Sequence, residues 1–112
     1  MLTENQAAVA NTILNQIGKK ALFMIGAKGI VFYSEGFGGM AFKTMRVPSS
    51  YANHIKIMLD EDDTYTMKFS RMWGLSRKLI CEEKGVYCDM LHLMIEKYTG
   101  LTTTLPTVFR KH

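Results

Sequence analysis

Cysteine and long hydrophobic runs are both scarce in this sequence. Its 112 residues contain no apolar run near the roughly 20 residues of a membrane-spanning helix, so we expect no membrane contact. Two cysteines, Cys81 and Cys88, are too few for the disulfide framework of a small secreted domain. Residues 1–6 include an acid and no basic cluster, which is not typical of a signal peptide. Together these absences predict a cytoplasmic protein.

Motifs for redox chemistry and metal binding are also missing. The cysteine spacing, C-x6-C, is neither the C-x-x-C redox motif nor a zinc knuckle. Cys88 and His92 lie one helical turn apart, but two ligands do not complete a zinc site. The simpler interpretation places Cys81 in a strand and Cys88 at a helix edge, each partly buried as a small hydrophobic residue. We therefore expect no metal ion and no cofactor.

Two loops offer a ligand-binding interpretation that their sequences do not favour. Residues 60–63, Asp-Glu-Asp-Asp, supply oxygens for a hard cation but lack the spacing and the mid-loop glycine of an EF-hand. Residues 36–39, Gly-Phe-Gly-Gly, are not followed by the Lys and Ser or Thr of a phosphate-binding loop. We expect a solvated hairpin turn at the first loop and a strand-connecting turn at the second.

Catalytic residues are not evident either. A nucleophile needs a base, and the base needs a group that orients it. His54 and His92 are the plausible bases, and neither has a recognisable Ser-His-Asp or Cys-His arrangement around it. We name no catalytic residues and expect a protein that is not an enzyme, with a small enzyme of unknown type as the least supported alternative.

The composition that remains is that of one folded domain. Apolar residues make up 47% of the chain and charged residues 21%, which is enough for a hydrophobic core and unlike a disordered chain. We predict a single α+β domain over residues 1–101. The threonine-rich segment 102–112, which contains Pro106 and ends in Arg110, Lys111 and His112, is expected to be a loosely held tail.

Helical patterns occur near both ends of the domain. Thr3 and Gln6 form a capping-box pattern, and apolar residues recur every four positions behind it, so we predict a helix over 4–17 that ends at Gly18. A second helix is predicted over 87–98, before Gly100. Its apolar stripe comprises Tyr87, Leu91, Met94, Ile95 and Tyr98.

Strand patterns fill the middle of the chain. The segments 21–25, 30–33, 40–46, 54–59, 64–73 and 77–83 are rich in β-branched and aromatic residues, and short turns separate them. Alternation predicts that His54 points outward, while Tyr65 and Trp73 point into the core. We expect an antiparallel meander of about five to six strands, with both helices over one face in a two-layer domain.

Basic residues are frequent in these strand segments. The net charge is +4, and the strands carry Lys43, Arg46, Lys56, Lys68, Arg71, Arg77 and Lys78. Lys56 and Lys68 alternate with the outward sets of their strands, so they should share one face. Such a surface could follow phosphates or dock an acidic protein, or the lysines could only suppress edge-to-edge aggregation. We take these seven residues as the candidate partner-binding surface.

Three blocks of the sequence resemble a family of small uncharacterised proteins encoded by tailed phages, prophages and other bacterial mobile elements. The first runs from Asn11-Thr12-Ile13-Leu14 to Lys28, the second from His54-Ile55-Lys56-Ile57 to Asp63-Thr64-Tyr65, and the third from Lys84-Gly85-Val86 to Thr99-Gly100-Leu101. The resemblance covers about residues 11–101 and carries no catalytic or cofactor residues. The stretch around Phe37 and the tail after Leu101 depart from it.

The resemblance implies a context for the expected function. Small phage proteins without an enzyme signature often act stoichiometrically on a host machine in the bacterial cytoplasm. We therefore expect a non-enzymatic accessory protein that binds a host protein or nucleoprotein complex, most of all an anti-CRISPR-like inhibitor of a defence system. The alternative is a nucleic-acid-binding accessory protein that uses the basic face of its sheet. The partner's identity, the oligomeric state and the order of the strands are left open.

Overall fold

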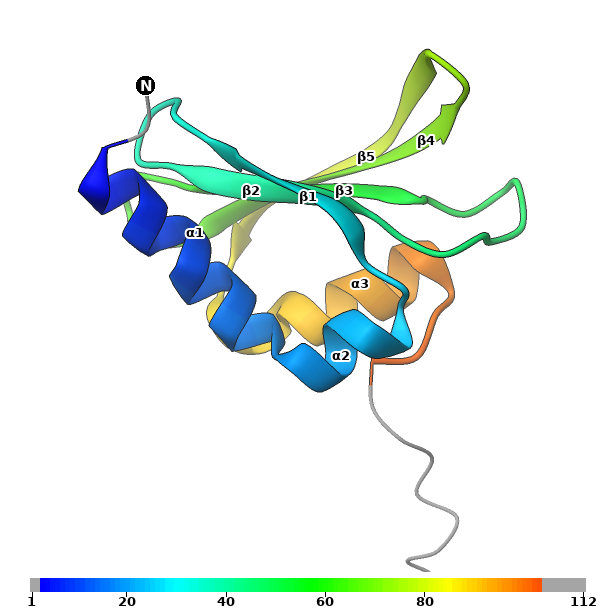
Figure 1. Ribbon diagram of the computed structural model, residues 1–112, viewed down its shortest axis with the longest axis horizontal. Coiled ribbons are helices and arrows are strands. Elements are labelled where there is room, and N and C mark those ends of the chain that lie inside the picture. The colour runs from blue at the N-terminus through cyan, green and yellow to red at the C-terminus, as the bar shows by residue number, and fades with distance from the viewer. Residues whose placement is uncertain (1–2, 104–112) are drawn as a thin grey trace, which may run out of the picture.

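Five antiparallel strands form the single sheet of this protein (Figure 1). The computed structural model describes residues 3–103. The strands are β1 (Lys28–Tyr33), β2 (Gly39–Lys43), β3 (His54–Leu59), β4 (Tyr65–Trp73) and β5 (Ser76–Val86). They lie side by side in chain order, because each is joined to the next by a short connection. The expected meander is confirmed, with five strands.

The helices cover one face of this sheet. They are α1 (Glu4–Ile17), α2 (Lys19–Met24) and α3 (Leu91–Thr99), with a single 3-10 turn, η1 (Cys88–Met90), ahead of α3. All lie below the strands in Figure 1. The two-layer α+β architecture is therefore as expected. None of the helices within residues 3–103 is long and apolar enough to span a membrane.

The first helix follows its sequence signals closely. The Thr3 hydroxyl accepts a hydrogen bond from the Gln6 backbone N–H at 3.1 Å, and the Gln6 side chain accepts one from Thr3 N–H at 3.0 Å. This capping box satisfies two N–H groups that have no partner within the helix. At the other end, Gly18 has φ +91°, which a residue with a Cβ rarely adopts, and the chain turns there.

The segment predicted as a first strand is a helix instead. Residues 21–25 fall mostly in α2, whose sequence Lys-Lys-Ala-Leu-Phe-Met consists largely of good helix formers. Five apolar residues are too few for periodicity to separate a strand from a helix. Once Gly18 has redirected the chain, the Leu22 N–H bonds the Gly18 carbonyl at 3.0 Å. Ala21 and Ile25 then pack into the core, while Phe23 is 85% exposed.

The second predicted helix begins later than its pattern indicated. Leu91 and Ile95 are fully buried in α3, and Met94 and Tyr98 pack partly against the core, as expected. Tyr87 precedes the helix and is 61% exposed, so its assignment to the buried stripe was wrong. Gly100, with φ +73°, ends α3 as predicted.

The end of the described chain remains attached to α3. Thr103 is buried, and both its N–H and its hydroxyl donate to the Glu96 carboxylate at 2.8 Å. These bonds lower the pKa of Glu96. The predicted tail thus contacts the domain at its start, and its remaining part, 104–112, lies outside the described residues.

Candidate functional site

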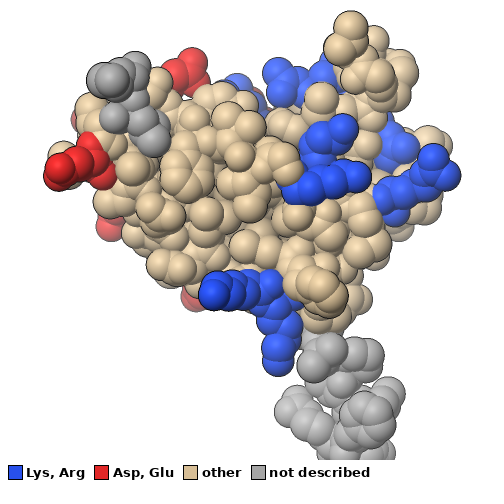
Figure 2. Space-filling view, in the orientation of Figure 1, with Lys and Arg blue, Asp and Glu red and all other residues tan. Residues whose placement is uncertain are grey.

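The face of the sheet opposite the helices carries a concentration of positive charge. Directly paired residues share a face of an antiparallel sheet, so the register assigns each side chain to one side. The basic residues that the register places on this side, which we call the open face, are Lys28, Lys43, Lys56, Lys68 and Arg77. Lys84 joins them, with its ammonium nitrogen 3.9 Å from the Glu82 carboxylate. Glu82 is the acid that the strands place among them. Figure 2 shows Lys and Arg gathered in the half of the molecule that contains the β4–β5 hairpin.

Like charges lie directly opposite one another on the open face. Lys28 of β1 pairs with Lys43 of β2, and Lys56 of β3 pairs with Lys68 of β4. Such pairs weaken strand association. Among residues 3–103, two carboxylates offset part of this charge: Glu35 lies 3.5 Å from the Lys56 ammonium nitrogen, and Glu82 of β5 pairs with Lys68. The arrangement is therefore not one that sheet stability alone favours.

A cavity of about 280 Å³ opens in the middle of this face. Its walls come from three adjacent strands: His54 and Lys56 of β3, Lys68 and Ser70 of β4, and Arg77 and Leu79 of β5. Antiparallel pairing brings these residues together, since Lys56 pairs with Lys68 and His54 with Ser70. Among the residues that the structure describes, no carboxylate lines the cavity. Its volume is at the lower limit of small-molecule pockets, which span roughly 300–1,000 Å³.

His54 is the unusual member of this group. It points to the open face, as alternation predicted, yet it is only 8% exposed. Its Nδ1 is buried and has no hydrogen-bond partner within residues 3–103. Buried polar atoms in folded proteins nearly always have a partner, so an orphaned one requires an explanation.

The electrostatic environment of His54 disfavours its charged form. Burial lowers its pKa below the ordinary value, and the positive charges of Arg77, Lys43 and Lys56 lower it further. The ring is therefore neutral at pH 7. As the pH falls through the ordinary histidine range, the unfolded chain takes up this proton first, so the contribution to stability declines toward acid.

The seven residues proposed as the binding surface do not all share one face. Four of them, Lys43, Lys56, Lys68 and Arg77, are on the open face, and three line the cavity. Their placement follows from strand alternation together with the antiparallel register.

Arg71 belongs to the other side of the sheet. One of its guanidinium nitrogens donates to the carbonyls of Val47, Pro48 and Tyr51 at 3.1–3.2 Å. It thus holds the loop between β2 and β3, so we interpret it as a structural residue. Lys78 pairs with Arg71 and shares its side.

Arg46 lies outside the sheet altogether. The strand predicted over 40–46 ends at Lys43, and Arg46 is exposed in the following loop. The Thr44 N–H bonds the Asn53 carbonyl at 2.9 Å, while the Met45 N–H turns to the Ile25 carbonyl at 2.9 Å. This divergence of successive N–H groups ends the strand pairing before Arg46.

Three residues of the open face escaped sequence reasoning. Lys28 was assigned to a turn, although β1 begins with it. Lys84 lies beyond the predicted end of the last strand, which continues to Val86. Only the three-dimensional packing reveals the burial of His54, although its place among outward-facing lysines was visible in the alternation.

The β4–β5 hairpin extends past the rest of the sheet (Figure 1). Trp73 near its tip is 55% exposed, so the expectation that it would be in the core was wrong, whereas Tyr65 at the other end of β4 is buried. Strand alternation is not broken there. The strand simply continues beyond the helices that cover its other end. Leu75, Leu79 and Ile80 are also exposed on this hairpin.

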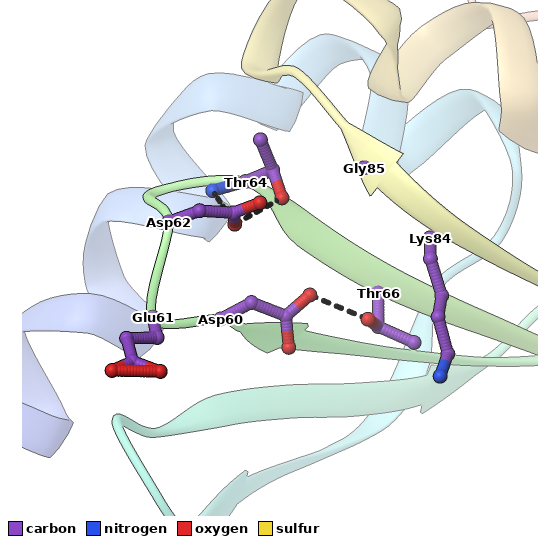
Figure 3. Close-up of a pocket in the computed structure, with 7 residues that line it drawn as sticks. All are labelled: Asp60, Glu61, Asp62, Thr64, Thr66, Lys84 and Gly85. Atoms are coloured by element: carbon purple, nitrogen blue, oxygen red, sulfur yellow. Dashed lines mark hydrogen bonds between the residues drawn. The ribbon is translucent and has the colours of Figure 1, made fainter.

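The acidic turn between β3 and β4 is a solvated hairpin connection, as expected (Figure 3). An Asp62 carboxylate oxygen accepts hydrogen bonds from the backbone N–H and the hydroxyl of Thr64, and these bonds lower the Asp62 pKa. Asp60 accepts one from the Thr66 hydroxyl at 2.5 Å. The carboxylates of Asp60 and Asp62 are thus hydrogen-bonded to threonines, and residues 3–103 contain no cluster of three metal-ligating side chains.

The cysteines and the second histidine have structural surroundings. The His92 ring nitrogen Nε2 lies 2.6 Å from the Ile17 carbonyl at the end of α1, which links α3 to α1. Cys81 is half-buried, as expected, and its thiol donates to the Tyr98 hydroxyl at 3.2 Å. Tyr98 in turn donates to Glu83, and these contacts raise its pKa. Cys88 is exposed, contrary to the prediction.

Comparison with known proteins gives no relative from which a role can be transferred. No protein-family model, no curated protein and no solved structure matches the chain. The open face is therefore interpreted from its own residues.

Proposed function

We propose that this protein acts by stoichiometric binding, and that its open face holds the phosphate backbone of a nucleic acid. The observation that carries the proposal is the row of six basic side chains across all five strands, with lysine placed directly opposite lysine. A polyanion bound across the face would neutralise the repulsion between these cations, because its phosphates attract each of them. Release of its counterions adds to the affinity.

The scarcity of aromatic residues on the open face indicates how the protein would contact a nucleic acid. Tyr33 is the aromatic side chain that the described strands place there, and the Lys56 ammonium lies 4.3 Å from its ring centre. Proteins that read bases on a sheet stack several of them on aromatic rings. Contacts here are mainly to phosphates, which position a chain without reading its sequence. We expect binding with weak sequence preference.

The test is a salt-dependent binding measurement on matched charge-reversal variants. Fluorescence anisotropy with labelled single- and double-stranded oligonucleotides should show binding that weakens on the order of 10²-fold between about 50 and 300 mM salt, if about four phosphates are engaged. Lys56→Glu with Lys68→Glu should abolish it. Lys19→Glu with Lys20→Glu makes the same charge change on exposed residues of α2, on the opposite layer, and should retain most of the affinity.

Two results would contradict the proposal. One is the absence of binding to either oligonucleotide at the lower salt concentration. The other is an equal loss in both double variants, which would show that net charge rather than the open face determines the binding. Far-ultraviolet circular dichroism of each variant confirms that the fold is retained.

A second candidate function rests on the β4–β5 hairpin. Its exposed Trp73, Leu75 and Ile80, together with Arg71 and Lys78 on the same hairpin, combine apolar and basic character. Tryptophan and arginine are enriched in residues that dominate protein–protein binding energy. With the resemblance to phage-encoded proteins, this supports an anti-CRISPR-like inhibitor that binds a defence complex in the bacterial cytoplasm.

This second function predicts a different mutational profile. Trp73→Ala with Leu75→Ala should prevent retention of a purified defence nuclease complex, while oligonucleotide binding is preserved. If no purified bacterial defence complex is retained by the wild-type protein, the inhibitor function is excluded.

A further inference from the structure

The cavity on the open face combines two independent features. In the described part of the chain, its walls hold three cations, those of Lys56, Lys68 and Arg77, and no acid. It is also lined by His54, which is more than nine-tenths buried and whose Nδ1 has no hydrogen-bond partner among residues 3–103. The first feature indicates the sign of a ligand's charge, and the second indicates an unfilled hydrogen-bonding position.

We propose that this cavity, here named the anion pocket, binds a single tetrahedral oxyanion and receives one phosphate group of the bound nucleic-acid chain. The identification of the phosphate as part of a nucleic acid rests on the proposed function. The pocket's own chemistry applies equally to free phosphate or sulfate.

The donor set selects a tetrahedral oxyanion over a carboxylate. Arg77 contributes a planar fork of N–H donors, Lys56 and Lys68 contribute ammonium groups, and Ser70 and His54 add a hydroxyl and a ring nitrogen. These groups come from three adjacent strands, so they surround a ligand rather than face one edge of it. A phosphate presents oxygens in several directions, whereas a carboxylate presents two in one plane. The cavity of about 280 Å³ is large enough for such a group.

Binding in the anion pocket must be linked to the protonation of His54. The groups that face the ring are Lys43 from β2, Lys56 from β3, Lys68 and Ser70 from β4, and Arg77 from β5. Burial and the cations lower the pKa of His54, and a bound anion counteracts those cations and so raises the pKa. Anion binding therefore takes up a proton, and the affinity rises as the pH falls toward that lowered pKa.

The test follows the ring signals of the three histidines by NMR in the full-length protein. A pH titration is recorded in sodium sulfate and, at equal ionic strength, in sodium chloride. Sulfate does not change its protonation over about pH 5–8, so a change in the ring signals over that range reports on the protein. We expect sulfate to raise the pKa of His54 more than chloride does. His92, whose ring is bonded to the Ile17 carbonyl, serves as an internal control and should not respond.

A substitution at the exposed edge of the anion pocket distinguishes an effect on anion binding from an effect on folding. Arg77 is exposed, so Arg77→Gln leaves the core intact. It should weaken sulfate binding about tenfold, the worth of one charge-assisted bond. It should also raise the pKa of His54 in the absence of sulfate, since a lowering charge is removed. Lys19→Gln on α2 should change neither quantity.

The ligand series distinguishes failure of the pocket from failure of the proposed function. Equal effects of sulfate and chloride on His54 would overturn the anion pocket, even where an oligothymidylate still binds the open face. A sulfate response without oligothymidylate binding would uphold the pocket and overturn the nucleic-acid function. A response to hexaglutamate but not to sulfate or inorganic phosphate would overturn the assignment to tetrahedral oxyanions.

Discussion

The two faces of the same five strands have opposite properties. The covered face is filled by fully buried apolar side chains, among them Met40, Phe42, Ile55, Ile57, Met67 and Phe69. The open face presents lysines, an arginine and an orphaned histidine on the alternate positions of the same strands. Burial of the first set stabilises the fold. The second set includes features that oppose stability, and this contrast is the reason that we propose the open face as the binding surface.

Removing one arginine from each face should give the largest difference between the two faces. Arg71→Ala deletes a cation that holds three loop carbonyls, so the free energy of unfolding should fall by about 1.5–3 kcal/mol, while oligonucleotide affinity changes little. Arg77→Ala should change the unfolding free energy by no more than about 0.5 kcal/mol and reduce affinity severalfold. Urea unfolding and anisotropy measure the two quantities. Equal effects of the two variants on both would remove the functional distinction between the faces.

A smaller effect is expected at the edge of the open face. Lys28→Glu replaces the like-charged pair with Lys43 by an opposite-charged pair, so it should raise the unfolding free energy by roughly 0.2–1 kcal/mol. The same change should weaken oligonucleotide binding and reduce its logarithmic salt dependence by about 1. Lys20→Glu, on an exposed helix position, is the control. If Lys28→Glu lowers both the unfolding free energy and the oligonucleotide affinity, Lys28 stabilises the fold and the prediction is wrong.

Much of the fold could be predicted because its signals are local. The helix over 4–17 is set by a capping box and a glycine, and both operate within a few residues. The alternation in β3 and β4 predicted their faces correctly. The segment 21–25 was misassigned because five apolar residues fit a strand or a helix, and the choice depends on the turn at Gly18 and on packing under the sheet.

The candidate site could be predicted only in part, for a related reason. Alternation placed Lys56 and Lys68 on one face, because their strands are regular. The same alternation puts Arg71 on the same side as Phe69 and Trp73 of β4. It could not place Lys78, whose side follows from the register of β5, where an irregularity falls between the partners of Phe69 and Ser70. The anion pocket requires three strands in register, and the burial of His54 depends on neighbours from β4 and β5. No pattern within a single segment records these contacts.

The central claim, that ligands bind the open face, is tested most directly through methionine methyl groups. Met58 and Met72 lie on the open face, while Met40 and Met67 are buried on the covered face of the same sheet. A titration of protein labelled with 13C at the methionine methyls, using an oligothymidylate, reports on both faces in one spectrum. We predict that the signals of Met58 and Met72 shift while those of Met40 and Met67 stay fixed. Shifts confined to Met24, Met90 and Met94 of the helical layer would contradict the account.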